Sequence, residues 1–174
     1  MFNYARHFGL LALLGAGLAI ARPRAGLGIG AQFALYGALH AAALVLSIRP
    51  GAACAPARRI LFVALAAALA LCNARLGLFG LHAAGEVVGP LGPLAVVAAC
   101  AASGALAYAA LISASLVRID LSSLAAISLG CAAVTACSFA IARAVLGAGV
   151  LWLVIPWWFA FSALLRYTEC RKVA

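Results

Sequence analysis

Four long stretches of the chain, residues 25–48, 87–117, 121–142 and 144–165, contain no Lys, Arg, Asp or Glu. At a rise of about 1.5 Å per helical residue, each stretch approaches or exceeds the ~30 Å hydrocarbon thickness of a bilayer. Their apolar residues would cover every side of a helix, whereas the strands of a membrane barrel alternate apolar and polar residues. The pattern therefore predicts an all-α, polytopic transmembrane helical bundle.

Around these stretches we predict six spans in one integral membrane domain, at residues 8–21, 25–48, 60–81, 89–117, 121–142 and 146–165. The first span has a second interpretation. A basic start, an apolar centre and small residues before Arg22 are also typical of a cleavable signal peptide, which would leave five spans. We favour a retained helix, because a polytopic protein can insert through its own first span.

The basic residues predict an orientation for the bundle. With the N-terminus inside, eight of the twelve basic residues fall on the cytoplasmic side of the predicted spans and four on the other side. This excess follows the positive-inside rule and places both termini in the cytoplasm. The preference for Arg over Lys and the many Ala residues suggest a bacterial source, so we expect a bacterial inner-membrane location.

Composition agrees with this class and excludes others. Hydrophobic residues make up 68% of the chain and charged residues 9%, against about 25% charged residues in soluble domains. The net charge of +9 does not predict nucleic-acid binding, because the basic residues are scattered between the apolar stretches and form no basic segment of their own. The expected partner is the lipid bilayer.

Candidate cofactor and catalytic residues are sparse. The six cysteines show no C-x-x-C pair and no metal-ligand spacing with His. Haem would need facing axial ligands, but we expect His7 near the inner end, His40 about two turns deeper and His82 near the outer side. We therefore predict no metal, no cofactor and no enzymatic activity, with a lipid-modifying enzyme using His82 and Glu86 as a weaker alternative.

Small residues predict how the helices pack. In lipid no hydrophobic effect drives apolar side chains together, so helices associate through close backbone contact at small residues. Gly26 and Gly30, continued by Ala34 and Ala38, form a smooth stripe on the second span. Such stripes also suit another copy of the chain, so we expect a homo-oligomer or other membrane subunits. A heptad seam follows on the fifth span, either for packing, which we favour, or lining a polar path: Ser128, Cys131, Thr135, Ser138 and Ala142.

One polar ridge is the best functional indicator in the sequence. Gln32, Tyr36 and His40 recur at four-residue intervals on the second span, and Asn73 on the antiparallel third span should reach a similar depth. Polar side chains at membrane depth are unfavourable unless they are partnered. The ridge is either a hydrogen-bonded packing seam or a path for a substrate or protons, with His40 as the titratable member.

A second cluster is predicted at the outer mouth. Arg75 lies inside an apolar pattern, and His82 and Glu86 follow it at helical spacing. Together they would suit an anionic headgroup or substrate, or they would form an ordinary interfacial salt bridge, with Arg75 extending toward the headgroups.

These features favour a small transport or permease-type protein, or a subunit of one, with a polar intramembrane seam. The alternative is a non-catalytic accessory or assembly subunit whose polar residues only pack helices.

Overall fold

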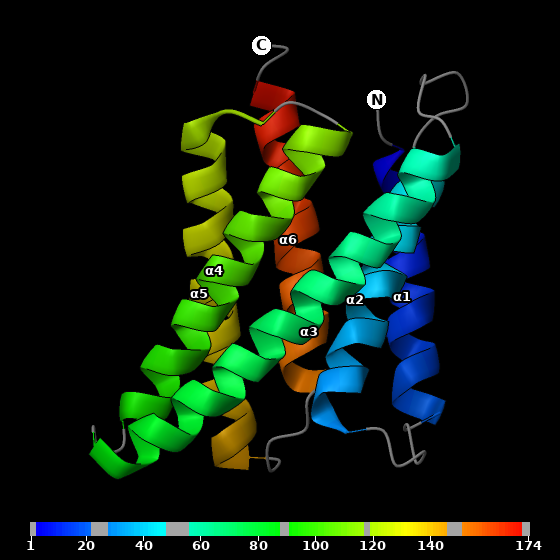
Figure 1. Cartoon of the computed structure of the whole chain (residues 1–174). Helices are drawn as coiled ribbons and strands as arrows, with labels where there is room; N and C mark the ends of the chain where they lie inside the picture. The colour runs from blue at the N-terminus through cyan, green and yellow to red at the C-terminus, as the bar shows by residue number, and fades with distance from the viewer. Residues whose placement is uncertain are drawn as a thin grey trace.

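The chain folds into six α-helices in this computed structural model (Figure 1). The structure describes residues 3–21, 28–47, 56–87, 91–116, 119–145 and 151–171. Within these residues the regular structure is helical throughout. The helices, in chain order, are α1 Tyr4–Ala21, α2 Ile29–Leu46, α3 Pro56–Val87, α4 Gly92–Ser115, α5 Leu121–Val145 and α6 Leu151–Arg171.

The predicted all-α class and the six helices are confirmed, and four of the helices, α2 to α5, are long and apolar enough to cross a membrane. The number of spans and their orientation stay predictions. The largest gain in length is in α3, which begins at Pro56 and continues to Val87 instead of covering residues 60–81. Neither His82 nor Glu86 breaks a helix, α3 also includes Gly85, and the next proline in the sequence is Pro90.

The slant of α3 follows from its length. At 32 residues it is about 48 Å long, well beyond the thickness of a hydrocarbon core. A helix of this length fits a bilayer by tilting. Figure 1 shows α3 crossing the front of the bundle diagonally, while α1 and α6 run more upright behind it.

The helices form a ring in which each packs against its neighbours in the sequence, from α1·α2 to α5·α6, and the contact between α1 and α6 closes it. The start of α1 and the end of α6 lie at the same end of the bundle (Figure 1). We call this the terminal end, and the opposite end the far end. Because the ring is closed, groups from α1, α2, α4 and α6 can meet in its interior.

Two glycines bring α2 close to α3. A Cβ atom at Gly37 would lie 2.6 Å from the Cβ of Ala70 and 2.9 Å from the carbonyl oxygen of Ala66. At Gly30 the same atom would lie 2.9 Å from Leu71. At Gly37 only glycine permits this separation without a shift of one helix, whereas at Gly30 a larger residue would require the Leu71 side chain to move.

The predicted small-residue stripe on α2 is therefore right at Gly30 but continues differently. Gly37, seven residues on, is the next glycine in close contact with α3, and Gly37, Ala34 and Ala38 are all half-buried. Gly37 lies on nearly the same side of α2 as Gly30, because seven residues fall only about 20° short of two full turns. Ala38, eight residues after Gly30, is about 80° past two full turns. Gly26, the first member of the stripe, lies outside the described residues.

The heptad seam of α5 faces its neighbours as predicted. Cys131, Thr135 and Ala142 are buried. The hydroxyl of Ser128 donates to the carbonyl of Ala102 on α4 at 2.9 Å, while that of Ser138 donates to the carbonyl four residues earlier in α5 at 2.8 Å. Most of the seam thus joins α5 to the rest of the ring.

Candidate functional site

A partly open cavity of about 300 Å³ lies between α2, α3, α4, α5 and α6. Small side chains on two helices create the space. On α3 they recur every three or four residues and so share one face, and a matching set lies on α4. These small lining residues are Ala66, Ala70, Ala74 and Gly77 on α3, and Cys100, Ala101 and Gly104 on α4.

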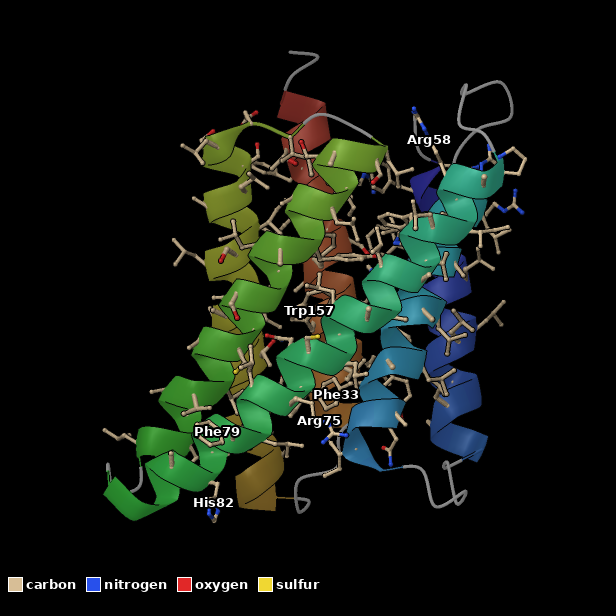
Figure 2. The ribbon with its side chains drawn as sticks, viewed as in Figure 1. Phe33, Arg58, Arg75, Phe79, His82 and Trp157 are labelled. Atoms are coloured by element: carbon tan, nitrogen blue, oxygen red, sulfur yellow. The ribbon has the colours of Figure 1, made fainter. Side chains whose placement is uncertain are left out.

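The cavity runs along the bundle axis and is closed at one end. Its lining on α2 extends from Ile29, at the far end, to His40, toward the terminal end, which is about 17 Å along the helix. Ile29 is 43% exposed, whereas His40 is 1% exposed. We call the region around Ile29 the mouth and the region around His40 the floor. Figure 2 shows two lining side chains, Phe33 and Trp157, in the interior behind α3.

Aromatic rings surround His40 at the floor. The centroid of its imidazole lies 5.4 Å from the ring of Tyr108, 5.9 Å from Trp157 and 5.8 Å from both Trp158 and Phe161. Trp157 and Trp158 directly follow Pro156 in α6. Although they are neighbours in the sequence, both rings contact the same imidazole. The imidazole is therefore held firmly, and Trp157, Trp158 and Tyr108 also line the cavity.

A chain of hydrogen-bonding groups continues from this floor toward α1. The oxygen of the Tyr108 hydroxyl lies 3.1 Å from His40 Nδ1. Nε2 of His40 lies 3.2 Å from Oγ of Ser162, which in turn lies 2.8 Å from Nε2 of His7. We call Tyr108, His40, Ser162 and His7 the polar chain. Its members come from α4, α2, α6 and α1, and all are buried.

The expected separation in depth of His7 and His40 is wrong, since their ring centroids are 5.7 Å apart. The helix boundaries explain the difference. Because α1 begins at Tyr4, His7 lies about 4.5 Å inside the terminal end of its helix, and His40 lies about 9 Å from the end of α2 at Leu46. The small remaining offset is bridged by Ser162.

Two buried hydroxyls beside the cavity have no hydrogen-bond partner among the described residues. Tyr36, which is 1% exposed, and Thr135, which is 5% exposed, both line the cavity, and neither side-chain oxygen is paired within the described part of the chain. The great majority of buried polar atoms in proteins are paired. These two hydroxyls are therefore unsatisfied polar groups beside the cavity, and each oxygen is itself buried.

Three of the four residues in the predicted polar ridge line this cavity: Tyr36, His40 and Asn73. Gln32 is half-buried one turn nearer the far end and is not among the lining residues.

The amide of Asn73 is engaged with α4. Its Nδ2 donates to the carbonyl of Cys100 at 2.9 Å, and its Oδ1 accepts from the Ser103 hydroxyl at 3.3 Å. A Cβ at Gly104 would lie 2.6 Å from that Nδ2, so the glycine makes room for the amide. Asn73 thus fastens α3 to α4.

The outer cluster is spread along α3. Arg75 lies against α2, where its Nε would be 3.3 Å from a Cβ at Gly30, and His82 follows two turns later with an exposed side chain. Figure 2 shows Arg75 beside the first turn of α2 and His82 pointing away from the bundle. Glu86 belongs to α3, but its side chain lies outside the described residues.

Sequence reasoning missed two members of the polar chain, Tyr108 and Ser162. Each is a single polar residue in an apolar stretch, so neither forms a pattern with neighbours on its own helix. The available signal was position: Ser162 lies four residues after Trp158, on the same face of α6.

The described residues contain no group of three or more His, Cys, Asp and Glu side chains that could hold a metal ion. Comparison with protein-family models, with curated proteins and with solved structures gave no match to this chain. The cavity and the polar chain are therefore the observations on which a function can be built.

Proposed function

We propose that this chain is a multi-pass protein of the bacterial inner membrane that binds a small molecule in the central cavity and transfers it within or across the membrane. The cavity is the observation that carries the proposal. Its volume of about 300 Å³ falls at the lower end of the range for small-molecule sites. Such sites are mostly apolar with a few placed polar groups, as in this cavity.

The cost of polar groups in a membrane also supports binding. A ring of helices needs no titratable group at its centre, and packing alone is served by small residues such as Gly30 and Gly37. Intramembrane His and unpaired hydroxyls are unfavourable and mark substrate or ion paths in many membrane proteins. Here His40, Tyr36 and Thr135 all border one cavity.

The second candidate is an accessory or assembly subunit without a substrate. The observation that favours it is the complete pairing of Asn73 with α4, together with the Ser128 bond from α5 to α4. These polar residues serve packing. They leave the function of the cavity to be tested directly.

Filling the cavity separates the two candidates. Ala74 on α3 and Val97 on α4 are buried lining residues, while Ala68 on α3 is exposed and lies away from the cavity. In cells lacking the chain, small-molecule profiles of cells and medium would be compared after complementation with wild type, Ala74→Phe, Val97→Phe or Ala68→Phe. Membrane levels of each variant would be measured in parallel.

For a transport protein, we expect wild type and Ala68→Phe to restore the profile, while both cavity-filling variants fail at normal membrane levels. The use of two cavity variants on different helices guards against one that does not fold. Full restoration by a variant that is present at normal levels and fills the cavity would refute the proposal and favour an accessory role.

A further inference from the structure

The lining of the cavity carries no permanent charge. Among the described lining residues there is no Lys, Arg, Asp or Glu, and His40 is their only histidine. Burying an ion in an apolar site without a counter-charge is strongly unfavourable. His7 on α1, whose ring centroid lies 5.7 Å from that of His40, also carries no fixed charge. The lining therefore selects a neutral occupant.

Polarity changes along the length of the cavity. At the mouth the lining is aliphatic, with Ile29, Leu81 and Val96. Toward the floor it includes the hydroxyl of Tyr108 and the imidazole of His40. A molecule with one polar end would place that end at the floor, because the aliphatic lining of the mouth offers it no hydrogen bond, and would leave its apolar part among the aliphatic side chains. Arg75 lies beside the mouth, against Gly30 in the first turn of α2, but is not among the lining residues.

The polar chain determines which polar end fits. With neutral imidazoles, and with Ser162 donating within the chain, two arrangements satisfy all three contacts. In one, the Tyr108 hydroxyl donates to His40, His40 to Ser162, and Ser162 to His7. In the other, every donation is reversed and the hydrogen of the Tyr108 hydroxyl is left free.

Tyr108 can therefore accept a hydrogen bond in the first arrangement and donate one in the second. Because it lines the cavity, the floor can pair with a group that donates, such as a hydroxyl, or with one that only accepts, such as a carbonyl. The hydroxyls of Tyr36 and Thr135, which have no partner among the described residues, belong to the same lining.

From these observations we infer that the cavity takes a neutral single-chain amphiphile, with a hydroxyl or carbonyl head at the floor and an apolar tail toward the mouth. This inference rests on the proposed function and names the class of molecule that the protein binds.

Photo-crosslinking in lipid nanodiscs tests the inference on the full chain. The probes are 1-decanol, decan-2-one, decanoate and decylammonium, each with a diazirine near the tail end, and 1-decanol with a diazirine next to the hydroxyl. Labelled residues are mapped by mass spectrometry, and specific labelling is the part that excess unlabelled 1-decanol removes.

The two neutral tail-end probes should label residues at the mouth, such as Leu81 and Val96, and the head-end probe should label residues near His40. The charged probes should label at least about tenfold less, which corresponds to about 1.4 kcal/mol. Unlabelled 1-butanol has the same hydroxyl head as 1-decanol but a tail too short to reach the aliphatic residues of the mouth. At equal concentrations in the bilayer it should therefore compete less well with the labelled probes than unlabelled 1-decanol does. Equal competition by the two alcohols would overturn the assignment of the mouth to the tail.

Variants locate the head. Tyr36→Phe and Thr135→Val each remove one unpartnered hydroxyl, and each should lower specific labelling by about fivefold, the value of one hydrogen bond. Ser138→Ala is the matched control, because its hydroxyl bonds only within α5. Unchanged labelling in both hydroxyl variants would refute the head position.

The outcomes also separate this inference from the proposed function. Specific labelling of the cavity by the charged probes, as strong as by the alcohol, would overturn the neutral class and leave a binding cavity in place. Absence of specific labelling by every probe would refute both. Loss of labelling in Ala74→Phe, with retention in Ala68→Phe, would support both.

Discussion

The polar chain gives the most direct test of what holds the centre of the bundle together. Ser162→Ala removes one oxygen that contacts Nε2 of His7 at 2.8 Å and Nε2 of His40 at 3.2 Å, and the site is fully buried. Hydrogen bonds between membrane helices average about 0.6 kcal/mol each and reach about 1.7 kcal/mol. We therefore expect a loss of about 1 to 3 kcal/mol in the free energy of unfolding.

Equilibrium unfolding in mixed micelles with an increasing fraction of SDS measures this loss. Ser138→Ala is the matched control, since that hydroxyl only returns to its own helix at 2.8 Å, and should change the free energy by less than about 0.5 kcal/mol. A double-mutant cycle with His7→Phe isolates the contact between His7 and Ser162. Our reasoning would be wrong if Ser162→Ala were no more destabilising than Ser138→Ala, or if the effects of the cycle were additive.

Three further pairs of measurements test the fold. Gly37→Ala should cost about 1 to 3 kcal/mol because its Cβ would collide with α3, whereas Gly17→Ala, with nothing within 4 Å, should be neutral or slightly stabilising in the same unfolding assay. Leu11→Ala at a fully buried site on α1 should cost about 2 to 5 kcal/mol, and equal effects of Leu11→Ala and of Leu13→Ala at an exposed site would contradict the packing of α1. Asp120→Ala removes the acceptor of a 2.8 Å bond from a backbone N–H in the first turn of α5, so thermal denaturation should show a loss of about 1 kcal/mol that Asp120→Asn largely restores.

The helices could be predicted from the sequence because apolar stretches between isolated arginines reflect a single physical requirement, the hydrogen bonding of the backbone inside lipid. Their ends could not be predicted equally well. Residues such as His82 and Glu86 are compatible with a helix or with a connection, and the actual end of α3 at Val87 comes just before Gly89 and Pro90. The shift of a helix end by a few residues also moved His7 and His40 to the same level.

The cavity could be predicted only in part. Periodicity on one helix identified Tyr36 and His40, since both lie on one face of α2. Contacts between different helices depend on rotation and register, which a single sequence does not specify, and so Tyr108 and Ser162 were missed. The partnered state of Asn73 and the unpartnered state of Thr135 likewise depend on what the neighbouring helix presents at that level.

The contact between His7 and Ser162 has a consequence for biosynthesis. It joins the first helix to the last, across a separation of 155 residues. During synthesis from the N-terminus, His7 and His40 are both made before Ser162 has been translated. Until α6 is complete, the two imidazoles therefore lack the hydroxyl that they share in the finished protein.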